Sequence, residues 1–432
     1  MLELLLPSTK IILEMVGWSC IGGLGLSFYL EDNSSPTERT IKQFFINTGL
    51  YIKQKEDKKL LPQLIDYKQE KEEQELFIYT IPNGLSIKQF EDKKKALEHQ
   101  LKGELELWAL DNKLHIRLYS SELPNRANFT ENMGFILKQV KKAKLGLSVG
   151  FSRRGYIVND FSKATCHIVL GGQTGAGKSV LLRQLILSGM LAYNHHELQY
   201  YFIDLKGGIE MIHFNDSAHT KKIAENEHDT LLILEQLNED VDERLRMLKS
   251  KGVTSIYDFK NNTLPKKVLV VDELAELQGN DDCIELIERL LRLARATGIH
   301  LVTATQRPDR NVLPGQLKAN LPVSVALKCK NDVNSMILLD NNEGAYLENV
   351  AGRGIYQLNQ NIKIQVPFVS VKDTRRLIEL RNIELNYKST NGHNVHLKKA
   401  TSKVNTKVED KSSNQQSNKD LESSNSWGEV IC

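Results

Sequence analysis

A short glycine-rich segment that ends in lysine and serine has the residue types and spacing of a phosphate-binding loop. Residues 172–179 are Gly-Gln-Thr-Gly-Ala-Gly-Lys-Ser, which fits the pattern GxxxxGK[ST]. Glycines let backbone N–H groups approach and surround phosphate oxygens. The segment predicts an ATP site in which Lys178 reaches the β- and γ-phosphates and the Ser179 hydroxyl binds Mg²⁺. The candidate nucleotide-binding residues are Gly172, Gln173, Thr174, Gly175, Ala176, Gly177, Lys178, Ser179 and Val180.

A second candidate group is the acidic pair Asp272-Glu273, which follows the apolar run Val268 to Val271. Four apolar residues predict a buried strand, and ligands of α/β sheets bind at the carboxyl ends of strands. Asp272 is a candidate Mg²⁺ partner that acts through water. Glu273 is placed to accept a proton from the attacking water. This pairing favours an ATPase over a kinase or a Ras-like GTPase.

Two further candidates for catalysis are a glutamine and an arginine. Residues 299–304 predict a third strand, followed by Gln306. If this strand lies between the other two, the Gln306 amide points at the γ-phosphate, where it can position water; the alternative is a turn residue that bonds only to backbone. A cation from a neighbouring subunit often completes such a site. The helix predicted over 283–297 offers Arg289, Arg292 and Arg295, and further candidates are Arg307, Arg310 and Arg353, each with a surface salt bridge as its alternative.

The elements around these residues alternate between strand and helix from 145 to 370, which indicates a parallel α/β sheet. Residues 166–170 predict the strand before the glycine loop and 179–193 the helix after it. The positive end of that helix would face the phosphates. Strand, loop and helix in this order argue against a chance glycine loop.

Several segments together resemble the FtsK/SpoIIIE family of DNA translocases. They are Ala-Arg-Ala-Thr-Gly-Ile-His-Leu at 294–301, Ala-Thr-Gln-Arg-Pro at 304–308, and the segments 203–207, 318–322 and 337–340. The resemblance covers about residues 150–370. It implies a RecA-like P-loop ATPase that works as a hexamer of identical subunits around DNA. Arg295 matches a family arginine, which implies that Arg295 is the finger supplied to the neighbouring subunit.

The departures from the family pattern point to one branch of it. Ser324 stands where the chromosome pumps usually have arginine, and Asn334-Ser335-Met336 replaces Asp-Ser-Arg. The polar tail cannot form the winged-helix module of those pumps. The chain looks more like the shorter FtsK-type proteins of plasmids and integrative conjugative elements, as does Gly352-Arg353-Gly354. That likeness implies a coupling protein for DNA transfer, with a relaxase and a membrane channel as partners.

Other functions stay open at this point. They are a type VII-like protein-secretion ATPase, a pump for plasmid or chromosome partition, and a nucleotide-switched anchor. DNA contacts are expected to be electrostatic and independent of sequence. The segment 308–320, with Arg310 and Lys318, is a candidate pore loop, and 204–207 is a candidate coupling segment; an ordinary surface loop is the alternative for each.

Length and composition suit a multidomain globular protein. The chain has 432 residues, 41% of them hydrophobic, and a net charge of +3, which suggests two or three domains and excludes a histone-like basic protein. The expected organisation is a membrane anchor in 1–38, a small α+β adaptor or ring-forming domain in 39–144, the ATPase domain in 145–386 and a disordered polar tail in 387–432. Within the small domain, 87–101 predicts one helix, and 105–110 with 113–119 predicts a hairpin.

The stretch 11–30 has two interpretations. It is uncharged from Met15 to Leu30, close to the length that spans a bilayer. A membrane helix and a buried helix or hairpin both fit. Five scattered cysteines without CxxC spacing predict neither a disulfide framework nor a zinc site, and favour the cytoplasm.

Overall fold

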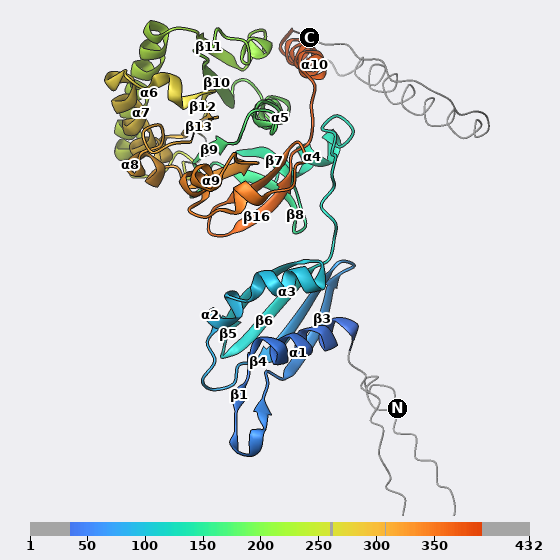
Figure 1. Ribbon diagram of the computed structural model, residues 1–432. Coiled ribbons are helices and arrows are strands. Elements are labelled where there is room, and N and C mark those ends of the chain that lie inside the picture. Colours follow the sequence, from blue (N-terminus) through green and yellow to red (C-terminus); the bar gives the residue numbers. More distant parts are fainter. Residues whose placement is uncertain (1–34, 260–261, 307, 391–432) are drawn as a thin grey trace, which may run out of the picture. The chain divides into compact units, whose positions relative to one another are not determined.

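The computed structural model describes residues 35–259, 262–306 and 308–390. Within them the chain forms two compact units that meet in sequence at Ser120 and Ser121 (Figure 1). The expected anchor at 11–30 and the tail from 391 onward lie outside the described residues. Among the helices of the described part, none has the length and apolar character needed to cross a membrane.

The first unit is a four-stranded antiparallel sheet with helices on one face. Phe45, Phe77, Tyr79 and Leu97 form part of the core between helices and sheet. The strand order is β3-β4-β6-β5, and a short β1–β2 pair stands beside it. The elements are α1 (Pro36–Thr48), β1 (Ile52–Lys53), η1 (Lys55–Asp57), β2 (Lys59–Leu60), β3 (Leu64–Lys71), β4 (Gln74–Thr80), α2 (Ile87–Glu91), α3 (Lys94–Leu101), β5 (Glu104–Leu110) and β6 (Lys113–Tyr119).

Two local predictions for this unit have different outcomes. The hairpin is confirmed, because β5 pairs with β6 and Asp111 and Asn112 have φ of 51° and 56°, as a two-residue type I′ turn requires. The single helix over 87–101 is wrong. The structure has α2 and α3 in its place, because Asp92 caps the first helix and Lys93 precedes the second.

The second unit is built on one large sheet. In the described residues ten strands have the order β11-β10-β12-β13-β9-β14-β15-β16-β7-β8. The six strands from β11 to β14 are parallel to their neighbours, and the other four extend the sheet in antiparallel fashion. The strands are β7 (Gly146–Ser152), β8 (Gly155–Asp160), β9 (His167–Gly171), β10 (Leu198–Ile203), β11 (Thr220–Ala224), β12 (Lys266–Val271), β13 (Ile299–Thr305), β14 (Val323–Leu327), β15 (Arg353–Gln357) and β16 (Asn361–Gln365).

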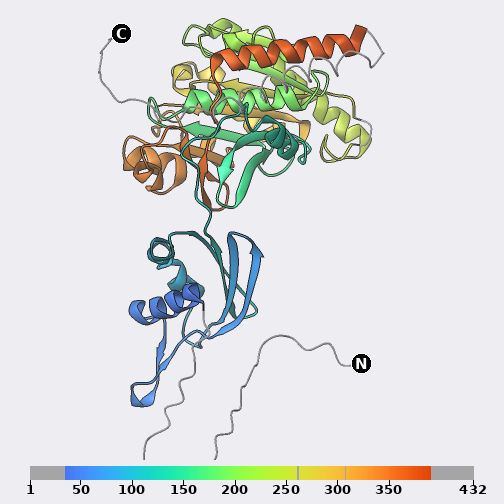
Figure 2. The ribbon, with the colours of Figure 1, turned by 90° about the vertical axis from the view of Figure 1, so that its right-hand side faces the viewer.

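Helices cover both faces of this sheet. On β12, Val268 and Val270 pack into one core, and Leu269 and Val271 pack into the other; such burial on both sides is typical of parallel strands. Figure 2 shows α10 beside α5 on one face. The helices are α4 (Met133–Val140), α5 (Lys178–Ala192), η2 (Ile212–Phe214), α6 (Glu227–Lys251), η3 (Leu274–Leu277), α7 (Asp281–Leu293), η4 (Ala294–Thr297), α8 (Gly315–Ala319), α9 (Asp332–Leu339), η5 (Glu343–Tyr346) and α10 (Val371–Thr390).

The boundaries differ from those expected at 144–145 and 386–387. Residues 121–144 belong to the second unit, because Ile136 and Val140 of α4 pack in the same core as Leu181 of α5. The Phe129 N–H also donates to the Phe368 carbonyl at 2.9 Å. At the other end, α10 continues through residues 387–390.

Candidate active site

The glycine-rich segment forms the turn between β9, which ends at Gly171, and α5, which begins at Lys178. Gly175 and Gly177 have φ of +82° and +104°, a conformation that residues with a Cβ rarely adopt. The first N–H groups of α5 have no partner within the helix and face this turn. The turn can therefore present backbone donors to an anion at the positive end of a long helix.

Lys178 links this loop to the acidic pair on another strand. Its ammonium group lies 2.9 Å from the Asp272 carbonyl oxygen and 2.9 Å from Asp272 Oδ1, and both side chains are buried. Burial raises the pKa of Asp272, while the Lys178 charge lowers it. The contact is possible because β13 lies between β9 and β12, so the carboxyl ends of all three strands meet at one edge.

Glu273 and Gln306 meet at the same edge. The Gln306 backbone N–H donates to Glu273 Oε1 and Oε2 at 3.2 and 3.0 Å. The Gln306 side-chain oxygen accepts from the Thr174 hydroxyl at 3.2 Å. The strand before Gln306, β13, lies between β9 and β12, as a role at the γ-phosphate requires. Gln306 bridges the glycine loop and the Glu273 carboxylate.

Lys206 also belongs to this group of side chains. The sequence indicated this lysine only as part of the candidate coupling segment 204–207. Lys206 Nζ lies 3.1 Å from Glu273 Oε2. Lys206 comes three residues after the end of β10, which is the neighbour of β12. The Asp-Leu-Lys sequence directly after the predominantly apolar strand β10 was the available signal, but sequence does not reveal which carboxylate a lysine contacts.

Two cavities, each of about 360 Å³, open at this edge of the sheet. The first touches the glycine loop and is lined by Gly172, Gln173, Thr174, Gln306, Pro308, Asp309, Cys329, Lys330 and Asn334. The second is lined by Lys206, Glu273, Ala275, Glu276, Gln278, Gln306, Asp309 and Val312. The sequence prediction missed Asp309, Lys330 and Asn334, although all three follow the carboxyl ends of β13 or β14.

The residues present suit a magnesium–triphosphate. Ser179 lies in the first turn of α5 and is half-buried. Asp272 is hydrogen-bonded to Lys178, the residue before Ser179. Among the described residues no group of three or more His, Cys, Asp or Glu side chains could form a metal cage. Mg²⁺ at phosphate sites uses few protein ligands and keeps water and phosphate oxygens, so one hydroxyl and one nearby carboxylate are a sufficient set.

The connection between β14 and β15 holds the glycine loop from the other side. The Gln173 N–H donates to the Lys328 carbonyl at 2.9 Å, and the Gly352 N–H donates to the Ala176 carbonyl at 3.0 Å. Gly352 has a φ of +80°, and a Cβ there would lie 2.9 Å from Gln365 Nε2. The same Cβ would lie 3.2 Å from the Val366 carbonyl oxygen, so the positive φ and the close backbone together favour glycine at 352.

The structure does not bring Arg295 to the site of its own chain. Arg295 is exposed in η4, which precedes β13. It therefore lies at the amino edge of the sheet, while the loop lies at the carboxyl edge. A strand the length of β13 spans on the order of 20 Å. Because of this separation, Arg295 cannot reach the ATP site of its own chain.

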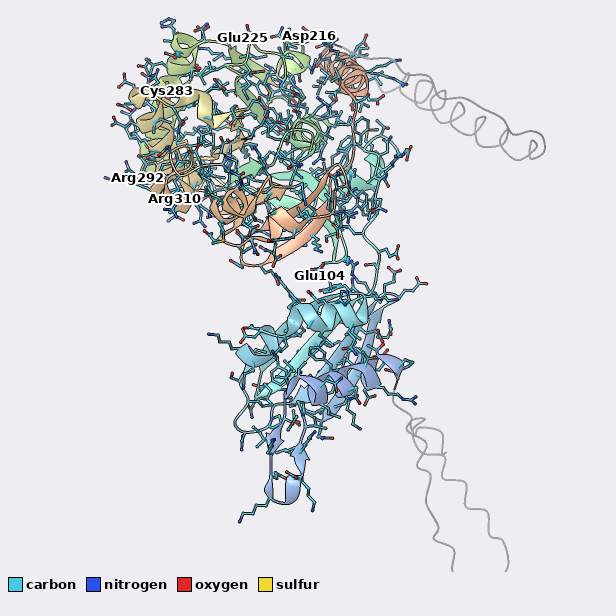
Figure 3. The ribbon with its side chains drawn as sticks, in the orientation of Figure 1. Glu104, Asp216, Glu225, Cys283, Arg292 and Arg310 are labelled. Atoms are coloured by element: carbon cyan, nitrogen blue, oxygen red, sulfur yellow. The ribbon has the colours of Figure 1, made fainter. Side chains whose placement is uncertain are left out.

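The other basic candidates have varied surroundings. Arg353 is buried and donates to the Pro124 carbonyl and Asn125 Oδ1, which makes it a structural residue. Arg289 pairs with Asp242 at 2.6 Å, and Lys318 pairs with Asp340 at 2.7 Å. Arg292 and Arg310 are exposed at the periphery of the second unit (Figure 3). Arg307 lies outside the described residues.

Fold and site together define the α/β class of P-loop ATPase domains. Residues 137–268 match the model of the FtsK/SpoIIIE family, in agreement with the sequence resemblance. It is 28% identical over 282 residues to the DNA translocase FtsK of Sporosarcina ureae, an alignment that covers 60% of this chain and 36% of that protein. The chain thus spans about a third of the length of this curated relative.

Solved structures give the same fold at low identity. The pCW3 conjugation coupling protein TcpA, solved as a monomer with ATPgS, has a TM-score of 0.54 and 22% identity, with 80% of this chain and 100% of that chain covered. EssC from Geobacillus thermodenitrificans, containing ATPases 2 and 3, has a TM-score of 0.52 and 15% identity, with 62% of this chain and 53% of that chain covered.

Proposed function

We propose that this chain binds ATP with Mg²⁺, hydrolyses it and uses the energy to move DNA. The contact between Lys178 and Asp272 carries the proposal, because it unites the glycine loop with the acidic strand end at one edge of the sheet. The match to the FtsK/SpoIIIE family model and a relative named as a DNA translocase support the same activity.

The residues have distinct tasks in this reaction. The backbone N–H groups of 172–179 and the Lys178 ammonium bind the phosphates. Ser179 and, through water, Asp272 would hold Mg²⁺, which would supply positive charge against the phosphate oxygens. Glu273 accepts a proton from the attacking water. Gln306 orients that water, since it contacts both Glu273 and Thr174.

The remaining cation comes from a neighbouring subunit in a hexameric ring. Arg295 is the candidate, because it is exposed and distant from its own loop. The same ring would enclose DNA and grip its phosphates with lysines and arginines. Arg310 is better placed for this than Lys318, whose charge is paired with Asp340. The first unit then serves as an adaptor or ring-forming domain.

The biological setting of this proposal is conjugative transfer of a plasmid or integrative element. The likeness in fold to a conjugation coupling protein over 80% of this chain supports this setting. The motor would face the cytoplasm, with residues 11–30 as an anchor in the cell membrane, and a relaxase and a membrane transfer channel would be its partners.

ATPase activity of the purified chain, measured with different effectors, tests the proposal. A rise with linear duplex or single-stranded DNA is expected. The second candidate, a protein-secretion ATPase, is favoured by the fold shared with EssC; it predicts stimulation by a secreted polypeptide and none by DNA. A nucleotide-switched anchor predicts ATP binding with negligible turnover, and a partition pump predicts stimulation by DNA without any effect on conjugation in cells.

A further inference from the structure

The Glu273 carboxylate is engaged by donors on both of its oxygens. Only 4% of its side chain is exposed. Oε2 accepts from the Lys206 ammonium at 3.1 Å and from the Gln306 N–H at 3.0 Å, and Oε1 accepts from the same N–H at 3.2 Å. An ionised carboxylate has about four lone-pair sites, and these two donors engage both sites of Oε2 and one of Oε1, so Oε2 cannot accept a proton from water while Lys206 is in place. In this arrangement Glu273 is restrained from acting as a base.

The backbone of Lys206 is held in place by hydrogen bonds, whereas its side chain is free to change partners. The Asp204 carboxylate is buried and accepts from the backbone N–H groups of Lys206, Glu210 and Met211 at 3.0 to 3.2 Å. This network fixes the turn. The Lys206 side chain, in contrast, is 38% exposed. Its ammonium group can therefore leave Glu273 by rotation of the lysine stem alone.

The surface around Lys206 is open to a partner. Ile209 and Ile212 on the same turn are 69% and 53% exposed. Lys206 and Glu273 line the second cavity, whose lining comes from the ends of β10, β12 and β13 and includes none of residues 172–180, all of which the structure describes. Glu276 and Asp309 also line this cavity and repel anions inside it, so an anion reaches Lys206 from the solvent-exposed side of the lysine. A phosphate that reaches Lys206 by this route comes from outside the glycine loop.

We infer that Lys206 is a phosphate-responsive restraint on Glu273, which releases the base when its ammonium group transfers to a DNA phosphate. The inference rests on the proposed ATPase function and deepens it, because it links hydrolysis to the presence of DNA. Lys206 is a positioning residue, since it acts through Glu273. The γ-phosphate of ATP offers the same oxyanion chemistry, so the experiment must separate the two sources.

The experiment compares ATP turnover of full-length wild type, Lys206→Gln, Lys206→Arg and Lys222→Gln, with and without linear duplex DNA. Lys222 is an exposed lysine on β11, so its variant removes the same charge without touching Glu273. Thermal melting and ATPγS binding show that each variant is folded. For Lys206→Gln the expected result is a DNA-free kcat raised roughly two- to fivefold, as loss of one partly exposed ion pair allows, with little further stimulation by DNA and an unchanged KM for ATP.

The other variants and outcomes decide the inference. Lys206→Arg and Lys222→Gln should behave like wild type. A DNA-free kcat of Lys206→Gln that falls or is unchanged, a raised KM for ATP, or a stimulation ratio equal to that of wild type would overturn the inference; a raised KM would identify the γ-phosphate as the oxyanion that Lys206 binds. Wild-type protein without any ATPase activity would instead reject the proposed function.

Discussion

The Lys178 ammonium group lies 2.9 Å from both the backbone oxygen and Oδ1 of Asp272, although 94 residues separate the two in sequence. A buried lysine and a buried carboxylate stabilise each other's charge, and each becomes costly when the other is removed. The phosphate-binding loop and the acidic strand end are therefore coupled in stability as well as in function.

The Lys178→Ala variant should lose both ATP affinity and stability. It removes the phosphate ligand and leaves Asp272 buried without its cation, at a cost of about 3–5 kcal/mol. Titration with a fluorescent ATP analogue and urea unfolding measure the two effects. Lys163→Ala is the matched control, because the Lys163 side chain is 76% exposed. Combining Lys178→Ala with Asp272→Asn should recover stability without recovering ATP binding; no recovery would contradict the coupling.

The Glu273→Gln variant should bind ATP and retain it. The amide oxygen can still accept from the Gln306 N–H, but an amide cannot take a proton from water, so turnover should fall by roughly 10²- to 10⁴-fold. Rapid-quench measurement of bound nucleotide against released phosphate checks this. Wild-type turnover in the variant would remove Glu273 from the role of base.

The Arg295→Ala variant should lose ATPase activity while keeping its melting temperature, because the side chain is exposed and far from its own loop. Mixing it with Lys178→Ala subunits should restore part of the activity, since these supply Arg295 to an intact site. Arg292→Ala, another exposed arginine on the preceding helix, should retain activity alone. Mixtures that never recover activity would disprove the assignment in trans.

The Gly352→Ala variant should weaken ATP binding through the backbone. A Cβ at this φ of +80° would lie 2.9 Å from Gln365 Nε2, and it would push residue 352 away from the Ala176 carbonyl. The left-handed conformation itself costs about 1–2 kcal/mol. Gly252 has a φ of +66° and open space around an added Cβ. The Gly252→Ala variant therefore has the same conformational cost but no steric contact. Equal ATP affinity in the two variants would contradict a role of Gly352 in shaping the loop.

Buried histidines should make the second unit less stable in mild acid. Burial lowers the pKa of both His167 and His300 to about 3, whereas an unfolded histidine titrates near about 6.5. Below that value the unfolded chain binds the extra protons, so stability present at higher pH is lost as the pH falls from about 6.5 towards 3. Urea midpoints at about pH 7.5 and about pH 5 measure the loss. His300→Gln should reduce it, and His196→Gln, at an exposed position, should leave it unchanged.

The catalytic edge of the sheet could be predicted because it depends on local patterns. Each strand is an apolar run followed at once by a chemically distinctive residue, and the carboxyl ends of parallel strands share one edge. This rule predicts that Lys178, Asp272 and Gln306 lie close together, and the structure agrees. It did not place Lys206, since a long flexible side chain can reach several carboxylates from the same backbone position.

The antiparallel part of the sheet was not foreseen for a different reason. β16 pairs with β7 through Gln365 and Phe151, and strands more than 200 residues apart leave no periodic signal that connects them. The boundary between the units was misplaced in the same way, because α4 joins the core of the second unit through its packing against α5, β7 and β8, which follow it in the chain.

The packing of α4 determines where a fragment that contains only the second unit should begin. A polypeptide that starts at Leu145 would lack Ile136 and Val140, leaving an apolar hollow beside α5, and the Arg353 guanidinium would lose its acceptors at Pro124 and Asn125. Such a fragment is prone to aggregate, so the shortest autonomous version should begin at Ser121.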